Sequence, residues 1–268
     1  MVGSGQRARS LIIVGCTFLI SHRQTADVLA LPENEVHLYW LASGMAAVGD
    51  QWLALLSSDE RERHSRFLFE KDRRIFLLGH AMARLALARY TGSDPASLEF
   101  EVNTYGKPSL HPRAGAPCPA FNLSHTHGMV ALAVAHEPDI GVDVEDTART
   151  GDWAHLAGNV FTAEEQAGLW RLPPEERQPR FYELWTLKEA YIKARGMGLS
   201  LPLDGFSIRM PEDGPIGIRF EAAIADDAAC WQFEMFAIGT FRLALAIRAR
   251  SRRKWTVRLL AGETGLAL

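Results

Sequence analysis

Two helix-forming segments, each followed by a glycine, most constrain how this chain can fold. Residues 76–90 read FLLGHAMARLALARY and are followed by Gly92, and residues 180–195 are followed in the same way by Gly196. A glycine just past a helix favours a left-handed C-cap, so both helices have a defined end. Because short strand patterns flank each helix, the sequence predicts a mixed fold built from two halves.

The strand patterns suggest antiparallel pairing and a boundary near residues 136–141. The link His-Glu-Pro-Asp at 136–139 is short and turn-like, so we expect a hairpin between the strands on either side of it. No long linker and no convincing internal repeat is present in the sequence. We therefore expect an α/β (α+β) protein in which residues 1–33 are a flexible extension, 34–138 the N-terminal subdomain, 139–255 the C-terminal subdomain and 256–268 a tail.

Composition and charge narrow the class of protein. The chain is 47% apolar and 23% charged, as in soluble globular proteins, and its net charge of -3 argues against nucleic acid as the main partner. Three widely spaced cysteines favour a reducing compartment, without disulfides or a structural zinc site. The apolar run 11–20 is too short to span a membrane and lacks a convincing cleavage site. We expect a cytoplasmic protein without a membrane partner.

The segment GVDVE at 141–145 places two carboxylates on one face of a predicted strand. Side chains alternate along a strand, so Val142 and Val144 point into the core while Asp143 and Glu145 share the opposite face. Carboxylates this close repel one another unless a cation lies between them, and hard oxygen ligands suit magnesium or manganese. A lone D-x-E is more often a solvated strand face, and that interpretation stays open for this motif.

A second motif, FYELWTLKEAYIKARGMG, occupies residues 181–198. At helical spacing Trp185, Glu189 and Ile192 share one face, and Lys193 lies one turn after Glu189. The ordinary interpretation is a Glu-to-Lys surface pair. However, Trp185 and Ile192 are expected to be buried, so Glu189 sits at the edge of the core, where a carboxylate needs a partner or a metal.

Three further segments carry groups that suit a phosphate ligand. FNLSHTHG at 121–128 places Ser124 and His125 before a strand, and YGKP at 105–108 presents Lys107 on a turn. A single histidine near a strand is more often structural, and one lysine on a turn is unremarkable. The basic residues of the third segment are interleaved with acids, for which a solvated helix is the usual interpretation. They are Arg61, Arg63, Arg66, Lys71, Arg73 and Arg74.

Each motif is weak alone, but their order is specific. FN-x-SH, then G-V-D-V-E, then W-x-x-K-E-A-x-x-K-A closely resembles the Sfp-type 4'-phosphopantetheinyl transferases. YGKP, the FTAEE helix start and GLSLPLDGFSI fit the same family, and the resemblance runs over residues 36–250. It implies a monomeric pseudo-dimer of two similar subdomains, each a small antiparallel-type sheet with helices, with coenzyme A in the cleft between them.

The resemblance also implies a reaction. Such an enzyme moves the 4'-phosphopantetheine arm of coenzyme A to a serine of an apo acyl or peptidyl carrier protein and releases adenosine 3',5'-bisphosphate. The activity is that of a holo-[acyl-carrier-protein] synthase, and its cofactor is Mg²⁺, with Mn²⁺ as the alternative. The carrier protein serves fatty acid, polyketide or non-ribosomal peptide synthesis, and the sequence does not say which.

By motif match, the resemblance assigns roles to individual residues. Asp143, Glu145 and Glu189 are the implied metal ligands, while Glu189, Lys193 and His125 are the implied catalytic residues. Trp185 and Lys188 are implied to be supporting residues, and for Glu165 in FTAEE a capping box is an adequate role. The implied coenzyme A contacts are Arg61, Arg63, Arg66, Lys107, Ser124, His125 and Lys193.

Two other functions stay open from the sequence. Three carboxylates and a metal also suit a nuclease or phosphohydrolase, although no second metal cluster is evident. A catalytically silent homologue that binds coenzyme A or a carrier protein is the other alternative. For docking of an acidic carrier protein, the sequence offers Arg171, Arg177 and Arg180 as a weak candidate surface.

Overall fold

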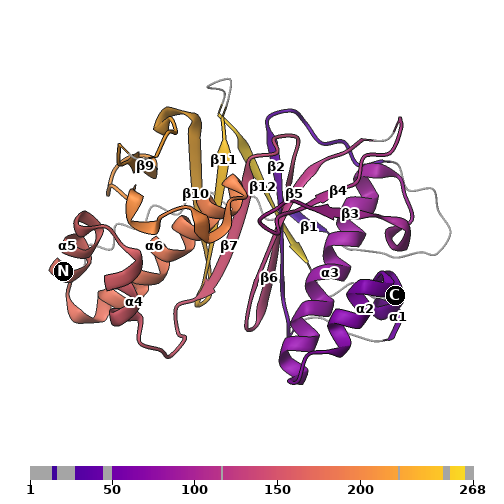
Figure 1. Cartoon of the computed structure of the whole chain (residues 1–268), viewed down its shortest axis with the longest axis horizontal. Coiled ribbons are helices and arrows are strands. Elements are labelled where there is room, and N and C mark those ends of the chain that lie inside the picture. The colour runs from indigo at the N-terminus through magenta and orange to yellow at the C-terminus, as the bar shows by residue number, and fades with distance from the viewer. Residues whose placement is uncertain are drawn as a thin grey trace.

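The computed structural model describes residues 14–16, 28–44, 50–115, 117–222, 224–249 and 254–262. Two long helices, α3 (Glu70–Thr91) and α6 (Pro174–Arg195), lie on opposite outer sides of the strands (Figure 1). Both helices have 22 residues, and both end at a glycine in the left-handed conformation, Gly92 with φ 65° and Gly196 with φ 62°. The predicted glycine-terminated helices are therefore confirmed, although each begins six residues earlier than the sequence suggested.

The first half contains a five-stranded sheet in the order β1-β12-β2-β6-β5. These strands span Val14–Cys16 (β1), Thr256–Gly262 (β12), Glu35–Ala42 (β2), Met129–Ala135 (β6) and Ala120–Thr126 (β5). Around them lie α1 (Asp50–Leu55), α2 (Ser58–Ser65) and the hairpin of β3 (Phe100–Val102) and β4 (Pro108–Leu110).

The second half contains a three-stranded antiparallel sheet in the order β10-β11-β7. Its strands are Trp231–Ile238 (β10), Phe241–Arg248 (β11) and Ile140–Asp146 (β7). The remaining elements are α4 (Trp153–Val160), α5 (Ala163–Arg171) and the hairpin of β8 (Phe206–Arg209) and β9 (Gly217–Phe220). Short 3₁₀ turns occupy Pro95–Ser97, Gly198–Ser200, Leu203–Gly205 and Ala228–Cys230.

Alternating side chains arrange these elements in four layers, helix on sheet on sheet on helix. Along β6, Val130, Leu132 and Val134 pack with α3 in one apolar cluster, while the alternate residues join a second cluster. That second cluster also contains Val142 and Val144 of β7 together with residues of β2 and β11, so the two sheets pack face to face. The predicted mixed α/β fold of small sheets with helices is confirmed, and the five-stranded sheet combines antiparallel pairs with the parallel pairs β1–β12 and β12–β2.

Two expectations about chain organisation need correction. Residues 136–139 do not form a hairpin turn, because β6 and β7 belong to different sheets. Residues 256–262, expected to belong to a tail, form β12 between β1 and β2, with Leu259 and Leu260 buried. Parallel pairing between residues 256–261 and 35–40 cannot be read from sequence periodicity, because the partner strand is more than 200 residues away.

Most of the expected N-terminal extension, residues 1–13 and 17–27, lies outside the described residues. The part that is described packs on the first half: the Leu29 amide donates to the Arg89 carbonyl at 2.7 Å, and Leu29 and Leu31 contact the core. Within the described part of the chain, no helix is long and apolar enough to cross a membrane.

Candidate active site at the junction of the two sheets

The edge strands of the two sheets, β5 and β7, lie against each other and are joined through side chains. The Val142 amide donates to Oδ1 of Asn122 at 2.8 Å, and Oγ of Ser124 donates to Oδ1 of Asp143 at 2.8 Å. One further step along the strands, the Thr126 hydroxyl donates to Glu145 at 3.5 Å. Alternate residues of the FNLSHT segment of β5 thereby contact the GVDVE segment of β7.

Asp143 is the centre of this junction. Nζ of Lys193 on α6 donates to Oδ1 of Asp143 at 2.6 Å and to Oγ of Ser124 at 2.8 Å, so three elements converge on one carboxylate. Asp143 is only 5% exposed, and its second oxygen, Oδ2, is buried without a hydrogen-bond partner. Buried polar atoms are nearly always satisfied, so an unpartnered carboxylate oxygen points to a cation that binds here.

Two more carboxylates, Glu145 and Glu189, lie near Asp143, and both have raised pKa values. Oε1 of Glu145 accepts from Nε1 of Trp185 at 3.2 Å, and burial followed by the charge of Asp143 raises the pKa of Glu145. Burial, the charge of Asp143 and that of Glu145 raise the pKa of Glu189 to about 7, against the opposing charge of Lys193. Two carboxylates whose pKa values are raised beside a third form a site that a divalent cation would stabilise.

Gly141 allows α6 to approach β7 closely enough to complete the site. A Cβ atom at this position would stand 2.0 Å from the Ala190 carbonyl oxygen and 2.3 Å from the Ala194 amide nitrogen. Both are backbone atoms of the helix that carries Glu189 and Lys193, so no larger residue fits without moving that helix. The GVDVE pattern predicted positions for its acids and valines but not this role of its glycine.

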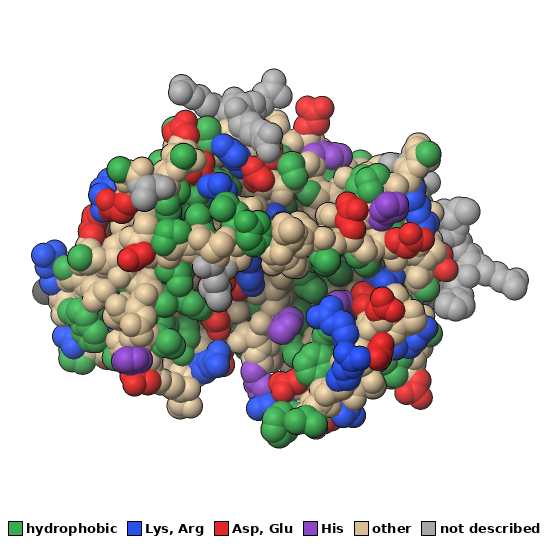
Figure 2. All heavy atoms as spheres, viewed as in Figure 1, with side chains coloured by type: hydrophobic (Ala, Val, Ile, Leu, Met, Phe, Trp, Pro, Cys, Tyr) green, Lys and Arg blue, Asp and Glu red, His purple; other side chains and the backbone are tan. Residues whose placement is uncertain are grey.

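A cleft of about 630 Å³ opens between the two halves, and of the three carboxylates Glu145 lines it. Figure 2 shows this hollow, with histidine side chains and a group of lysine and arginine side chains at its edge. Residues from α3, from the end of β5 and from the end of β7 line the cleft, among them Lys71, Phe76, His125, Glu145 and Arg149. Burial, followed by the charge of Lys193, lowers the pKa of His125, so its imidazole is neutral at pH 7.

Comparison with known proteins decides the family. Residues 46–137 match the family model described as 4'-phosphopantetheinyl transferase, N-terminal, and residues 139–246 match that of the 4'-phosphopantetheinyl transferase superfamily. A 4'-phosphopantetheinyl transferase of Bacillus subtilis is 37% identical over 170 residues, which cover 63% of this chain and 73% of that protein. The chain belongs to the 4'-phosphopantetheinyl transferase family.

Other phosphopantetheinyl transferases are similar to the same extent. The transferase HetI of Nostoc sp. is 38% identical over 173 residues, covering 64% of this chain and 73% of that protein. The transferase Sfp of Bacillus subtilis is 34% identical over 170 residues, covering 63% of this chain and 73% of that protein. The predicted membership of the Sfp-type family is therefore confirmed.

The carboxylates of this phosphopantetheinyl transferase fit a divalent metal ion by chemistry. All three donors offer the hard oxygen ligands that Mg²⁺ prefers, and the unpartnered Oδ2 of Asp143 is available to a cation. Among the residues that the structure describes, however, no group of three His, Cys, Asp or Glu side chains stands ready in ligating positions. The ammonium of Lys193 occupies the other oxygen of Asp143 instead.

The structure places the remaining predicted coenzyme A contacts in different surroundings. Arg61 donates to the Leu56 carbonyl, Arg63 lies over the Phe76 ring at 5.6 Å, and Arg66 forms an exposed ion pair with Glu62. These arginines do not line the cleft, whereas Lys71 from the same basic segment does. The roles of Arg61, Arg63 and Arg66 in coenzyme A binding stay predictions.

Lys107 also lies in surroundings that the sequence did not indicate. Its ammonium donates to three backbone carbonyls, those of Pro138, Ile140 and Ala194. Its role in binding coenzyme A stays a prediction as well.

Of the residues expected to be supporting ones, Lys188 is buried within the second half, whereas Trp185, expected to be buried, is half-buried there. Nζ of Lys188 donates to Oε2 of Glu165 at 2.7 Å and to the Phe206 carbonyl at 2.6 Å, and both side chains are almost fully enclosed. Glu165 also completes the capping box of α5 with Thr162, as predicted. Trp185 fixes Glu145 through its indole N–H and so supports the site directly.

Proposed function

We propose that this protein transfers the 4'-phosphopantetheine arm of coenzyme A to a serine hydroxyl of an apo acyl or peptidyl carrier protein, releasing adenosine 3',5'-bisphosphate. The observation that carries the proposal is the junction at Asp143, where Lys193 and Ser124 meet one carboxylate oxygen and the other is left unpartnered. Glu145, on the same strand, lines the adjoining cleft. Membership of the transferase family supports the same reaction.

Asp143, Glu145 and Glu189 are the residues that would hold the metal ion, for which we propose Mg²⁺, with Mn²⁺ as the alternative. A divalent ion bound there would supply positive charge to the pyrophosphate of coenzyme A. Its positive charge would also lower the raised pKa values of Glu145 and Glu189, since both are raised in part by neighbouring carboxylates.

The chain's own groups suit the rest of the reaction. The carrier serine oxygen attacks the β-phosphorus, the bond from that phosphorus to the oxygen bridging the α-phosphate breaks, and the adenosine bisphosphate leaves with the electron pair. Lys193 stabilises the charge that grows on the phosphates, and neutral His125 donates one N–H to them. Glu189 accepts the serine proton as the general base.

The finer assignments belong to the same proposal. We place the enzyme in the cytoplasm as a monomer whose partners are coenzyme A and a carrier protein, with neither nucleic acid nor membrane involved. The net charge of -3 supports the part of this proposal that concerns nucleic acid.

Intact-mass analysis of a carrier protein tests the proposal. A purified apo acyl carrier protein and, separately, a peptidyl carrier protein are incubated with the protein, coenzyme A and Mg²⁺, with EDTA in a parallel sample. A gain of about 340 Da that EDTA abolishes supports metal-dependent transfer. No gain on either carrier, with coenzyme A still bound tightly, would instead favour a silent binding homologue.

A further inference from the structure

The Lys107 side chain reaches from the turn before β4 across to the second half. Its Nζ lies 3.0 Å from the Pro138 carbonyl oxygen, 3.1 Å from that of Ile140 and 2.9 Å from that of Ala194. An ammonium group has three donors, and all three are directed at protein carbonyls here. Little of this side chain's hydrogen-bonding capacity is left for a ligand.

The three carbonyls belong to the elements that build the active site. Pro138 lies in the link between the halves, Ile140 is the first residue of β7, and Ala194 lies in the last turn of α6. Carbonyls in the last turn of a helix have no partner within the helix, so an ammonium group there both satisfies them and interacts well with the helix dipole. One side chain therefore ties the start of β7 to the end of α6.

The same turn makes a second attachment to α6. Nδ2 of Asn103 donates to the Gly196 carbonyl at 2.8 Å, while its Oδ1 accepts from the amides of Tyr105 and Lys107. The contact is close, because a Cβ on Gly196 would come within 2.8 Å of Cδ of Lys107. Asn103 thus holds the turn in a shape that keeps it in contact with the C-terminal end of α6.

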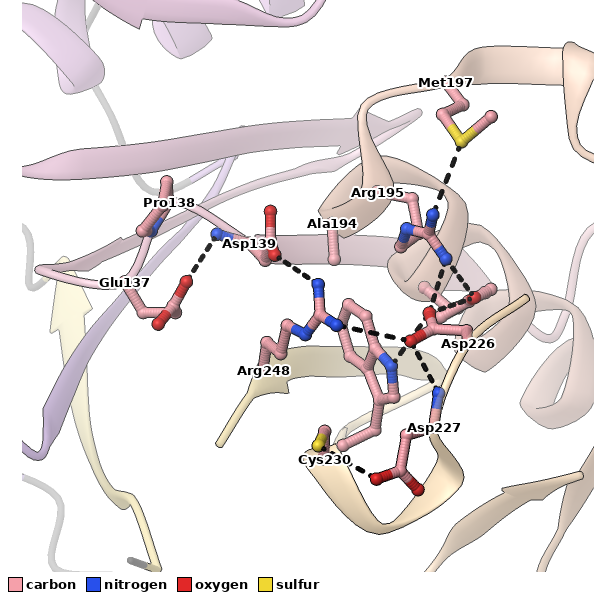
Figure 3. Close-up of polar contacts among 12 residues, drawn as sticks. Glu137, Pro138, Asp139, Ala194, Arg195, Met197, Asp226, Asp227, Cys230 and Arg248 are labelled. Atoms are coloured by element: carbon pink, nitrogen blue, oxygen red, sulfur yellow. Dashed lines mark hydrogen bonds and ion pairs between the residues drawn. The ribbon is translucent and has the colours of Figure 1, made fainter. Parts of the chain in front are cut away.

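A polar cluster also contacts the same link and helix end (Figure 3). Asp226, whose side chain is only 1% exposed, accepts from Arg195 of α6 and lies 3.6 Å from Arg248 of β11. Arg248 in turn pairs with Asp139 of the link at 3.2 Å. Because Lys107 and this cluster both attach the end of α6 to the link and the sheet, that helix end has little freedom to shift relative to β7.

We propose that Lys107 is a positioning residue, which sets the spacing between α6 and β7 and acts on phosphopantetheine transfer through Lys193 and Asp143 instead of contacting coenzyme A. This inference rests on the proposed function. Ala194 adjoins Lys193, and Ile140 precedes Asp143 by three residues, so a shift of the helix end changes the 2.6 Å contact between Lys193 and Asp143 directly. Misplacement by about 1 Å can cost about 100-fold in rate.

The test compares Lys107→Met with wild type and with Ser109→Ala, a control on the same hairpin whose hydroxyl makes only an exposed contact to Glu101. Calorimetry measures the Kd of adenosine 3',5'-bisphosphate, and the carrier assay gives kcat and the KM for coenzyme A, well below each variant's Tm. We expect kcat of Lys107→Met to fall about 10-fold or more, with Kd and KM changed less than about twofold. Ser109→Ala should match wild type.

Two results would overturn the inference. A Kd raised about 10-fold at unchanged kcat would make Lys107 a direct nucleotide contact. A lowered Tm with unchanged kcat and Kd would make it a stabilising residue only. If Lys107→Met does not fold, Asn103→Ala takes its place, since it removes one of the attachments to α6. This variant should also lower kcat, by a smaller factor than expected for Lys107→Met. An unchanged kcat of Asn103→Ala would equally refute the inference.

Amide hydrogen exchange separates this inference from the proposed function. Even if the wild-type protein transfers nothing to any carrier, Lys107→Met should speed exchange at 138–142 and 190–196, because those backbone segments lose their attachment. Unchanged exchange in both segments would contradict the positioning role, whatever the transfer assay shows.

Discussion

Replacing Gly141 by alanine tests how closely the site depends on the packing of α6 against β7. The added Cβ would stand 2.0 Å from the Ala190 carbonyl oxygen, and side chains in real proteins keep at least 3.0 Å from such atoms. Strand and helix must therefore separate by about 1 Å, because the interior is close-packed and the obstructing atoms are backbone. Overpacking of this kind costs about 3 kcal/mol or more.

The same displacement acts on catalysis. A shift of about 1 Å would take the contact between Lys193 and Asp143, now 2.6 Å, beyond hydrogen-bonding range. We expect the transfer rate to fall about 100-fold, measured by intact mass of the carrier under single-turnover conditions, and the free energy of unfolding in urea to fall by about 3 kcal/mol.

Gly79→Ala is the matched control for Gly141→Ala. Gly79 is also buried, in α3, but its Cβ would meet only side chains at ordinary contact distance, Leu123 at 3.5 Å and Val130 at 3.8 Å. This variant should keep the wild-type rate and lie within about 1 kcal/mol of wild-type stability. If Gly141→Ala behaved like Gly79→Ala in both assays, the close approach of α6 to β7 would not be what builds the site.

Three further predictions concern charged groups. Glu189→Gln should lower transfer more than 100-fold while Tm stays level or rises, because burial and neighbouring carboxylates already disfavour the charged form; near-normal turnover would contradict its role. Burial alone would raise the pKa of Glu60, but hydrogen bonds from His80 and Ser57 and the charge of Arg84 lower it to about 2 from 4.5. Glu60 therefore stabilises the fold above pH 4.5 and loses this effect as pH falls toward 2. Glu60→Gln should lower the free energy of unfolding in urea by up to about 3 kcal/mol at pH 7, and this loss should shrink between pH 5 and 3. A loss that stays constant with pH would refute this prediction. Lys188→Met should lower the free energy of unfolding by about 3–5 kcal/mol, because it leaves the Glu165 carboxylate buried without the Lys188 ammonium. The double variant with Glu165→Gln should recover part of this loss, whereas a loss below about 1 kcal/mol in Lys188→Met would contradict the prediction.

Local sequence patterns predicted the parts of the fold that depend on neighbouring residues. The two glycine-terminated helices, the capping box at Thr162 and the alternation in GVDVE all follow from hydrogen bonding and side-chain direction within a few residues. β12 was missed, because its assignment to the first sheet depends on a partner strand at the other end of the chain. The expected hairpin at 136–139 failed for a related reason: β6 and β7 each find a better partner elsewhere.

The sequence indicated most of the residues of the candidate site but few of the contacts between them. Spacing placed Asp143 and Glu145 on one face, and the motif resemblance added Glu189, Lys193, Ser124 and His125, of which Lys193 and Ser124 contact Asp143. Gly141 was missed because only the docked helix shows why a side chain cannot fit there. The three hydrogen bonds of Lys107 could not be predicted either, because their acceptors are backbone carbonyls, which every residue has.

The central claim is that one reaction at Asp143, Glu145 and Glu189 splits coenzyme A and modifies the carrier together. The most direct measurement follows both products in one sample, adenosine 3',5'-bisphosphate by chromatography and the carrier by intact mass, with and without Mg²⁺. The account predicts that the two products appear in equal amounts, only with the metal ion and not with Asp143→Asn. Release of nucleotide without a gain in carrier mass would instead identify a hydrolase and contradict the account.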